Sequence, residues 1–383
     1  MAEPHPDVVI VGAGIVGAAC ALALARERLR VLVLDSHFAG AGSTSAAMGH
    51  IVVMDDSEAQ LALTARSRQL WSGMAPELPA DCEDECRGTL WLATSEADMQ
   101  AAATRQASYA RRGIEASVID VGELARLEPN LRPGLAGALH VPGDRVLYPP
   151  AVARRLLEHA RQLGATLREG CTAQDVRART VIVQDSGGSV ATIAAGAVLI
   201  ASGIDAPRLI PELPVIPRKG HLLITDRYPS LCHSQLVELG YLRSAHTMSG
   251  ASVAFNVQPR ATGQLLIGSA RELTGRDPAI NHALLGDMLR RAIEFLPALA
   301  GCAAVRVWTG FRPATPDKLP LIGRWDAMDD VWIAAGHEGL GITMAPGTAE
   351  MIVSLMMGRT PPVDPLPFSP TRVLAASPPQ CAE

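Results

Sequence analysis

The sequence predicts an α/β (α+β) fold, with a Rossmann-like sheet into which a second domain, built on an antiparallel sheet, is inserted. Three observations support this prediction. Residues 8–17 have the pattern of a buried strand, a glycine-rich turn and the start of an Ala-rich helix. The strand-like run 31–34 then ends in an acid, Asp35. From Pro211 onward, apolar and polar residues alternate, which is typical of antiparallel strands.

The N-terminal turn has the Gly-x-Gly-x-x-Gly spacing of a dinucleotide-binding site. Gly12 allows the tight turn, Gly14 allows the backbone to approach a pyrophosphate, and Gly17 allows the helix to pack closely on the strand. Asp35 is placed to hydrogen-bond a ribose hydroxyl, which favours a nucleotide site over an ordinary β-α-β unit. The expected contacts are Gly12, Gly14, Ile15, Val16, Gly17 and Asp35.

Composition disfavours several function classes. The chain has 383 residues, 48% of them hydrophobic, which is enough for two domains with buried cores. Its 34 basic and 39 acidic residues are interspersed and give a formal net charge of −5. Because no basic stripe stands out, binding to nucleic acid or to anionic lipid is disfavoured.

Residues 8–25 carry no charge and are long enough for a membrane span or a signal peptide. The residues before them are acidic and interrupted by prolines, whereas a signal peptide begins with basic residues. We therefore expect that the chain has no transmembrane segment and that the protein is cytoplasmic. Association with the inner face of the membrane is compatible with this location.

The seven cysteines are scattered and odd in number, which predicts reduced thiols. Cys82 and Cys86 are the only two close enough to suggest a metal site. Two ligands in an acidic segment without a nearby histidine favour an acidic loop instead, so no metal is expected.

Hydrophobic periodicity predicts the order of the elements. Helices are expected at residues 58–75, 96–112, 122–129, 151–163 and in a stretch that includes 348–356. Strands of the first sheet are expected at residues 165–167, 181–183, 197–201 and 331–336, and antiparallel strands at 222–224, 253–255 and 265–267. The resulting domains are a discontinuous nucleotide domain (1–80, 141–213 and 318–365), a substrate domain (81–140 and 214–317) and a loosely wrapped Pro-rich tail (366–383).

Further segments have the small residues and turns that suit close contact with a cofactor. Segment 42–49 contains hydroxyls that can cap a following helix and bond phosphate oxygens. A strand ends in Ser202-Gly203, and a Gly-rich turn at 339–341 leads into the C-terminal helix. The expected additional contacts are Ser43, Thr44, Ser45, Ala47, Met48, Gly49, Val176, Ser202, Gly203, Gly339, Leu340, Gly341, Ile342 and Thr343.

Two C-terminal motifs complete the pattern, residues 310–323 (GFRPATPDKLPLIG) and 336–346 (GHEGLGITMAP). With the N-terminal fingerprint, they resemble the flavin amine oxidoreductases of the D-amino-acid oxidase, glycine oxidase and sarcosine oxidase superfamily over nearly the whole chain. Segment 49–56 is most similar to the catalytic β subunits of D-hydroxyproline dehydrogenase, opine oxidase and hydrogen cyanide synthase type enzymes.

The resemblance implies that the cofactor is FAD, with its ADP end at the fingerprint and its flavin end at the turn 339–341. A helix that starts near Ile342 would direct N–H groups at the flavin pyrimidine ring, where negative charge develops on reduction. The segment 313–323, where some relatives attach flavin covalently, has no cysteine, so non-covalent FAD is expected. An NAD-dependent dehydrogenase and a non-catalytic flavin-bound subunit remain alternatives.

The resemblance also suggests the substrate-binding residues. It places the substrate carboxylate on Arg312, within the apolar surroundings of Trp308 and Phe311. Tyr241 would lie over the substrate and donate to the same carboxylate. His50 would touch substrate or tune the flavin, with a buried structural histidine as the alternative.

The expected reaction is FAD-dependent oxidation of a D-amino or cyclic imino acid to the imine, by hydride transfer to flavin N5. D-Hydroxyproline and D-proline are the first candidates, with a dehydrogenase passing electrons to a quinone, a partner subunit or another non-oxygen acceptor. The alternative is a glycine, sarcosine or opine oxidase that produces hydrogen peroxide. His337 and Glu338 receive no role, and Lys219 is interpreted as the entry to a strand.

Overall fold

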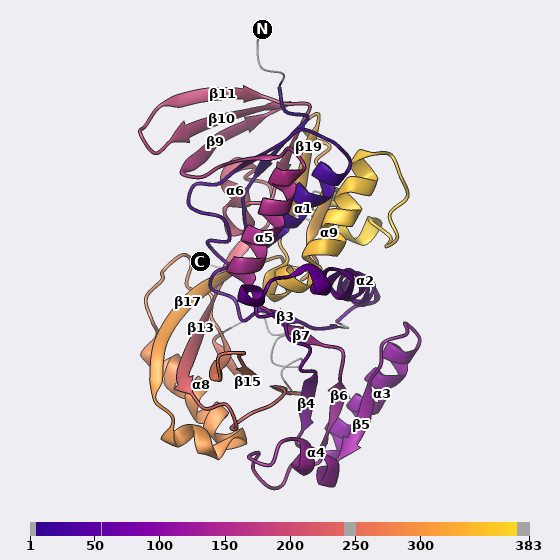
Figure 1. Ribbon diagram of the computed structural model, residues 1–383, viewed down its shortest axis with the longest axis vertical. Coiled ribbons are helices and arrows are strands. Elements are labelled where there is room, and N and C mark those ends of the chain that lie inside the picture. Colours follow the sequence, from indigo (N-terminus) through magenta and orange to yellow (C-terminus); the bar gives the residue numbers. More distant parts are fainter. Residues whose placement is uncertain (1–4, 55, 241–249, 374–383) are drawn as a thin grey trace.

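The computed structural model describes residues 5–54, 56–240 and 250–373. The chain forms two lobes, one around a mainly parallel sheet and the other around a large mixed sheet (Figure 1). Helix α2 (Glu58–Met74) and the short strands β3 (His50–Ile51) and β7 (Arg145–Val146) lie between them. The predicted α/β class is confirmed, whereas the predicted domain boundaries remain a prediction.

The first sheet has the strand order β18-β19-β12-β1-β2-β8, in which β18 alone pairs antiparallel. In strand β1, Val8 and Ile10 point to the face of the sheet that helices cover. Val9 and Val11 point to the opposite face and belong to a second hydrophobic core. The strands are β1 (Val8–Val11), β2 (Val31–Leu34), β8 (Thr166–Arg168), β12 (Ala197–Ile200), β18 (Leu321–Arg324) and β19 (Val331–Ala335). The helices on the first face are α1 (Ile15–Arg26), α5 (Pro149–Gln162) and α9 (Gly341–Met356).

The uncharged segment 8–25 is therefore a strand, a turn and most of helix α1 rather than one continuous helix. Among the described residues, one helical stretch, Glu338–Met356, is long and apolar enough to cross a membrane. It is 61% buried inside the protein and packs against α1 and α2. Its apolar residues are thus explained by their burial in the core of the first lobe.

Residues 181–183 do not join the first sheet, so that prediction is wrong. They belong to β10 (Thr180–Asp185), the middle of a three-stranded antiparallel sheet with β9 (Cys171–Arg177) and β11 (Val190–Ala194). Val181 and Val183 are buried while their neighbours are partly exposed, which is the alternation of a strand with one covered face. This small sheet caps the top of the lobe in Figure 1.

The second sheet has the order β17-β13-β16-β15-β14-β4-β6-β5 and confirms the predicted antiparallel strands, although β4 and β14 run parallel. Its strands are β4 (Thr89–Ala93), β5 (Ser117–Asp120), β6 (Gly137–Val141), β13 (Ile216–Arg227), β14 (Gln235–Glu238), β15 (Ser252–Pro259), β16 (Gln264–Arg271) and β17 (Ala304–Ala314). The remaining helices are α3 (Glu96–Ala110), α4 (Val121–Leu127), α6 (Ala206–Leu209) and α8 (His282–Phe295).

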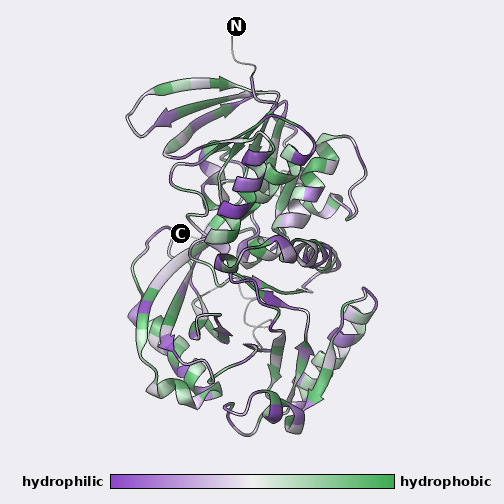
Figure 2. Cartoon of the chain, in the orientation of Figure 1, coloured by the Kyte–Doolittle hydropathy of each residue, from purple (hydrophilic) through white to green (hydrophobic). Residues whose placement is uncertain are grey.

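Local signals explain the predicted helices. The side chains of Ser57, Ser95 and Asp120 accept hydrogen bonds from backbone N–H groups in the first turns of α2, α3 and α4. Helix α5 has a hydrophilic and a hydrophobic side (Figure 2), and its buried residues face the first core. The start of the tail is packed rather than loose, because Phe368 is fully buried and Arg372 pairs with Asp317.

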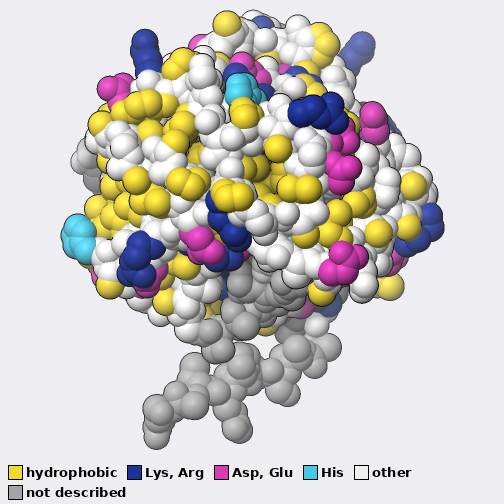
Figure 3. Space-filling view, turned by 90° about the horizontal axis from the view of Figure 1, so that it is seen from below, with side chains coloured by type: hydrophobic (Ala, Val, Ile, Leu, Met, Phe, Trp, Pro, Cys, Tyr) yellow, Lys and Arg dark blue, Asp and Glu magenta, His cyan; other side chains and the backbone are white. Residues whose placement is uncertain are grey.

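Charges of both signs lie among hydrophobic side chains on the described part of the face seen from below in Figure 3. This distribution agrees with the interspersed charges of the sequence. Cysteines among the described residues are unpaired, as predicted, and no group of three or more His, Cys, Asp or Glu side chains there could hold a metal ion.

Asp144 is a buried carboxyl group at the junction of the two lobes. It is 1% exposed and follows Gly143, whose carbonyl accepts a hydrogen bond from Arg68 of α2. Burial raises the pKa of Asp144 to about 7, although Thr89, Arg68 and the Val53 amide favour the charged form. The folded protein therefore holds this proton more tightly than the unfolded chain, and this group lowers stability as pH rises from about 4 to about 7.

We expect Asp144→Asn to stabilise the protein at pH 8 by about 2 kcal/mol, because it removes the cost of a buried charge. The gain should disappear at pH 4, where the folded wild type carries a neutral carboxyl group. Thermal unfolding of both proteins across this pH range measures the difference, with the exposed Asp326→Asn as control. If Asp144→Asn were destabilised equally at both pH values, the raised pKa of Asp144 would be contradicted.

Candidate flavin and substrate site

The N-terminal turn accepts only glycine at two positions. Gly12 has φ +112°, and a Cβ there would lie 2.5 Å from the carbonyl oxygen of Ala201, at the end of β12. A Cβ on Gly17 would lie 1.9 Å from the carbonyl oxygen of Gly12. Near Gly14, by contrast, only the Thr44 hydroxyl lies within 4 Å of such an atom. The turn is thus closed toward the sheet and more open at Gly14, as a phosphate-binding turn requires.

Asp35 and Thr44 hold this turn from the side. One oxygen of the Asp35 carboxylate accepts a 2.7 Å hydrogen bond from the Ala13 amide. The Thr44 hydroxyl accepts a 3.0 Å bond from the amide of Ile15, at the start of α1. Thr44 therefore caps the preceding helix α1.

The expectation that these hydroxyls cap a following helix is wrong, since turns occupy the segment after residue 40. Ser43 instead donates to the carbonyl oxygen of Phe311, and Ser45 donates to that of Gly42. The reason is that this segment crosses to the second sheet and is fixed there by strand β17.

The rest of segment 46–49 packs on both lobes. A Cβ on Gly310 would lie 2.4 Å from that of Ala46, whose carbonyl oxygen accepts a 3.2 Å bond from Trp308. The carbonyl oxygen of Met48 accepts a bond from the Gln258 side chain at 2.9 Å. Segment 46–49, which includes the predicted contacts Ala47 and Gly49, is thus held between the nucleotide turn and β17.

The start of α9 lies against β3. The Thr343 hydroxyl donates to the carbonyl oxygen of His50 at 3.1 Å and accepts from the Val52 amide at 3.2 Å. The Trp71 indole donates to the carbonyl oxygens of Ile342 and Thr343. Two predicted segments far apart in sequence, 49–50 and 339–343, are thereby brought together.

Arg312 lies on β17, opposite Arg218 of β13. Its side chain crosses β13 at Gly220, where a Cβ would lie 2.5 Å from Nη1, and Nη1 donates to the carbonyl oxygen of Ala270 on β16 at 3.2 Å. A Cβ on Gly339 would lie 3.7 Å from Arg312 Cδ and Nε. Backbone atoms of two strands and of the turn before α9 therefore lie close to this guanidinium, and the Glu338 carboxylate supplies a nearby negative charge.

A pocket opens beside this turn. It is lined from both lobes and includes the predicted site residues His50, Gly339 and Leu340, together with Glu338. Tyr241 lies outside the described residues. The lining residues are His50, Val52, Met54, Asp56, Gln60, Trp91, Arg218, Val237, Asn256, Arg271, Lys318, Glu338, Gly339 and Leu340.

Comparison with known proteins identifies the group to which this site belongs. A family model described as FAD dependent oxidoreductase (DAO) matches residues 7–355. The chain belongs to the DAO family of FAD-dependent oxidoreductases. It is an enzyme that uses FAD to oxidise an amino acid, and the predicted superfamily is confirmed.

Three relatives of this DAO family member match most of its length. Glycine oxidase of Geobacillus kaustophilus is 30% identical, with 96% of this chain and 97% of the relative covered. D-Amino acid dehydrogenase of Chromohalobacter salexigens is 28% identical (84% and 75%), and hydrogen cyanide synthase subunit HcnC of Pseudomonas protegens is 26% identical (97% and 97%). A crystal structure of glycine oxidase from G. kaustophilus superposes with a TM-score of 0.84 at 29% identity, covering 96% and 99% of the chains.

Features of this chain fit FAD in the site. The Ser202 hydroxyl is buried and has no hydrogen-bond partner among the described residues, and the adjacent Gly203 has φ +56°. Val176 is 2% exposed and packs into the core, so it would contact the cofactor through its backbone. Together with the opening at Gly14, the turn at Ser202 and Gly203 forms a cradle at the ends of β1 and β12. The individual contacts remain predictions.

Burial and charge set the protonation of the site. Burial, with Arg260 nearby, lowers the pKa of His50 to about 3, so its imidazole is neutral. Burial alone would raise the pKa of Glu338, but the guanidinium groups of Arg271, Arg312 and Arg218 hold it below its ordinary value. Glu338 is therefore an ionised carboxylate at neutral pH.

His337 and Lys219 have structural explanations. His337 Nε2 lies 2.9 Å from the Thr348 hydroxyl inside the core, and burial lowers its pKa to about 3. Lys219 of β13 is 2% exposed and pairs at 2.9 Å with Glu272, the residue that follows β16. The interpretation of Lys219 as a strand residue without a catalytic role agrees with this pairing.

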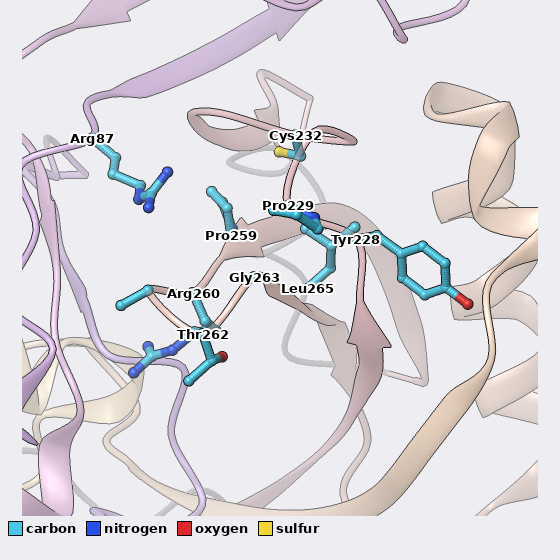
Figure 4. A pocket seen from close by; sticks show the side chains of 10 residues that line it. Arg87, Tyr228, Pro229, Cys232, Pro259, Arg260, Thr262, Gly263 and Leu265 are labelled. Carbon is cyan, nitrogen blue, oxygen red and sulfur yellow. The ribbon is translucent and has the colours of Figure 1, made fainter.

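Sequence reasoning missed Arg218 and Arg271 at the pocket. They are 3% and 4% exposed, and each is followed in the sequence by another charged residue, Lys219 or Glu272. Because charged neighbours are typical of exposed positions, the sequence carries no signal that these two arginines are buried. A second pocket, next to Arg87, Tyr228, Cys232 and Arg260 (Figure 4), has no carboxylate or imidazole among its described lining residues.

We expect Gly17→Ala to lower FAD affinity by at least about tenfold, because the added Cβ meets the Gly12 carbonyl and must displace the phosphate turn. Retention of yellow colour during dilution and filtration measures this loss, and flavin released after denaturation gives the total bound. Gly73→Ala in α2, where a Cβ meets nothing within 4 Å, is the matched control. Wild-type retention in Gly17→Ala would contradict the proposed turn.

Proposed function

We propose that this enzyme oxidises a D-amino acid or a cyclic imino acid to the imine as a dehydrogenase, with D-hydroxyproline and D-proline as the first candidates. The observation that carries the proposal is Arg312, whose guanidinium lies next to the turn 339–341 and close to the pocket. A relative named D-amino acid dehydrogenase supports the stereochemistry and the acceptor. A relative named as a subunit supports a partner protein as electron acceptor. A cytoplasmic location is part of the same proposal.

When bound, FAD supplies the hydride acceptor of the reaction. Arg312 would bind the α-carboxylate through paired, charge-assisted hydrogen bonds and so fix the orientation of the Cα–H bond. Leu340 and Val52, with Trp91, give the pocket apolar walls that exclude water from the reacting carbon. Neutral His50 lies in the same lining and can accept a hydrogen bond from the substrate nitrogen.

Glycine oxidase activity is the second candidate, because the relative of that name is 30% identical over 96% of the chain. A small substrate fits Arg312 equally well, since this residue would bind only the carboxylate. Anaerobic reduction with D-proline, cis-4-hydroxy-D-proline, sarcosine and glycine, followed by reoxidation with air or with a dye, distinguishes the candidates. Rapid reoxidation by air with release of hydrogen peroxide would favour the oxidase.

We expect Arg312→Ala to lower kcat/KM for reduction by the best amino acid about a hundredfold, which corresponds to a charged hydrogen-bond pair of about 3 kcal/mol. The flavin spectrum should stay that of the folded holoenzyme. Anaerobic bleaching of the flavin is the measurement, and Arg290→Ala, an exposed arginine on α8, is the control. Undiminished bleaching in Arg312→Ala would refute the carboxylate role.

We expect the limiting rate of flavin reduction to rise about tenfold per pH unit below the amine pKa of the bound substrate. The amine must lose its proton before the hydride leaves, and His50, with a pKa of about 3, cannot hold that proton at neutral pH. Stopped-flow reduction at saturating substrate measures the profile. His50→Asn should keep the midpoint of wild type, whereas a shifted midpoint or a flat wild-type profile would contradict this view.

A further inference from the structure

A row of three side chains crosses adjacent strands of the second sheet at the pocket. Val237 of β14 lies opposite Trp91 of β4 on one side and opposite Asn256 of β15 on the other. Residues paired in register point to the same face of a sheet, and all three of these line the pocket. Their sequence neighbours Leu236 and Phe255 belong to the core on the opposite face. The row therefore forms part of one pocket wall, with Trp91 and Asn256 on either side of Val237.

Both polar members of this row lack a hydrogen-bond partner within the part of the chain that the structure describes. The atoms concerned are Asn256 Oδ1 and Trp91 Nε1, and their residues are 5% and 4% exposed. The buried indole of Trp71 in α2, by contrast, donates to two carbonyl oxygens. Because a buried polar atom without a partner costs free energy, such atoms in a pocket lining are suited to a partner that arrives with the ligand.

The two atoms need opposite kinds of partner. The Trp91 indole can only donate a hydrogen bond, whereas Asn256 Oδ1 accepts one. A carboxylate could satisfy the indole alone, and an ammonium group could satisfy the amide oxygen alone. A hydroxyl group can accept from the indole and donate to the amide oxygen, and it brings no charge next to the apolar Val237.

Building on the proposed function, we infer that Asn256 and Trp91 recognise a hydroxyl group on the side chain or ring of the substrate. The hydroxyl would donate to Asn256 Oδ1 and accept from Trp91 Nε1, while Arg312 binds the α-carboxylate. His50 Nε2, likewise buried without a partner in the described chain, is left for the substrate nitrogen. Asn256 and Trp91 are then specificity-determining residues, and the preferred substrates are hydroxylated amino or imino acids.

Pairs of compounds that differ by one hydroxyl group test this recognition. Suitable pairs are cis-4-hydroxy-D-proline with D-proline, and D-serine with D-alanine. Anaerobic bleaching of the wild-type holoenzyme should give a kcat/KM at least about tenfold higher for the hydroxylated compound. The reason is that a compound without the hydroxyl leaves both buried atoms unpaired in the complex.

Variants that lack one of the two polar atoms assign the preference to these residues. Asn256→Leu, which is similar in size, should bring the two kcat/KM values of a pair within about threefold of each other. Trp91→Phe keeps an aromatic ring but removes the donor, and it should lose part of the preference. Gln174→Leu makes the same kind of change at an exposed position of β9 and should retain the wild-type preference.

The outcomes separate this inference from the proposed function. If no compound bleaches the flavin, with sarcosine and glycine included in the panel, the proposed function fails and the inference fails with it. If both members of each pair react equally fast with the wild type, hydroxyl recognition is refuted and the proposed function stands. If the preference persists undiminished in Asn256→Leu and Trp91→Phe, its assignment to this row is overturned. Should Asn256→Leu not fold, an undiminished preference in Trp91→Phe overturns it alone.

Discussion

The path of one arginine side chain determines much of the site. Arg312 reaches from β17 over β13 to a carbonyl oxygen on β16, and it can do so because Gly220 leaves the middle strand bare. The same face of the sheet receives the segment after the nucleotide turn, where Gly310 and Gly268 make room for Ala46 and Met48. Absent side chains on three strands therefore position both the guanidinium and the segment that would cover the flavin.

The two lobes are tied together by contacts that also build the site. Thr343 bonds the backbone of His50 in β3 and of Val52 just after it, and Ser43 bonds the backbone of β17. Each contact joins a segment predicted to bind FAD to a segment that lines the pocket or holds Arg312. Loss of the lobe arrangement would thus disturb cofactor and substrate binding together, and Asp144, buried at this junction, links it to pH.

Local patterns in the sequence predicted the parts that local physics determines. The strand, glycine and helix order at Gly12 to Gly17 and the capped helices α2 to α4 follow from short-range signals. The carboxylate-binding role of Arg312 was predicted from its place in a family motif. Arg218 and Arg271 were missed because their meeting depends on the strand order β17-β13-β16, which brings together residues distant in sequence. Strand β10 likewise joins a sheet with β9 and β11 rather than the first sheet, and this choice depends on strand pairing that a local pattern does not specify.

The charge distribution that would bind carboxylates also acts on the substrate nitrogen. Cations near an amine favour its neutral form, and Arg218 and Arg271 line the pocket while Arg312 lies beside its residue Gly339. His50 is neutral and Glu338 is held in its ionised form, so neither is poised as a base near neutral pH. In such a site the arginines would bind the substrate and also lower the pKa of its amine. Binding and deprotonation then have one electrostatic origin, which explains how the oxidation would proceed without a dedicated base.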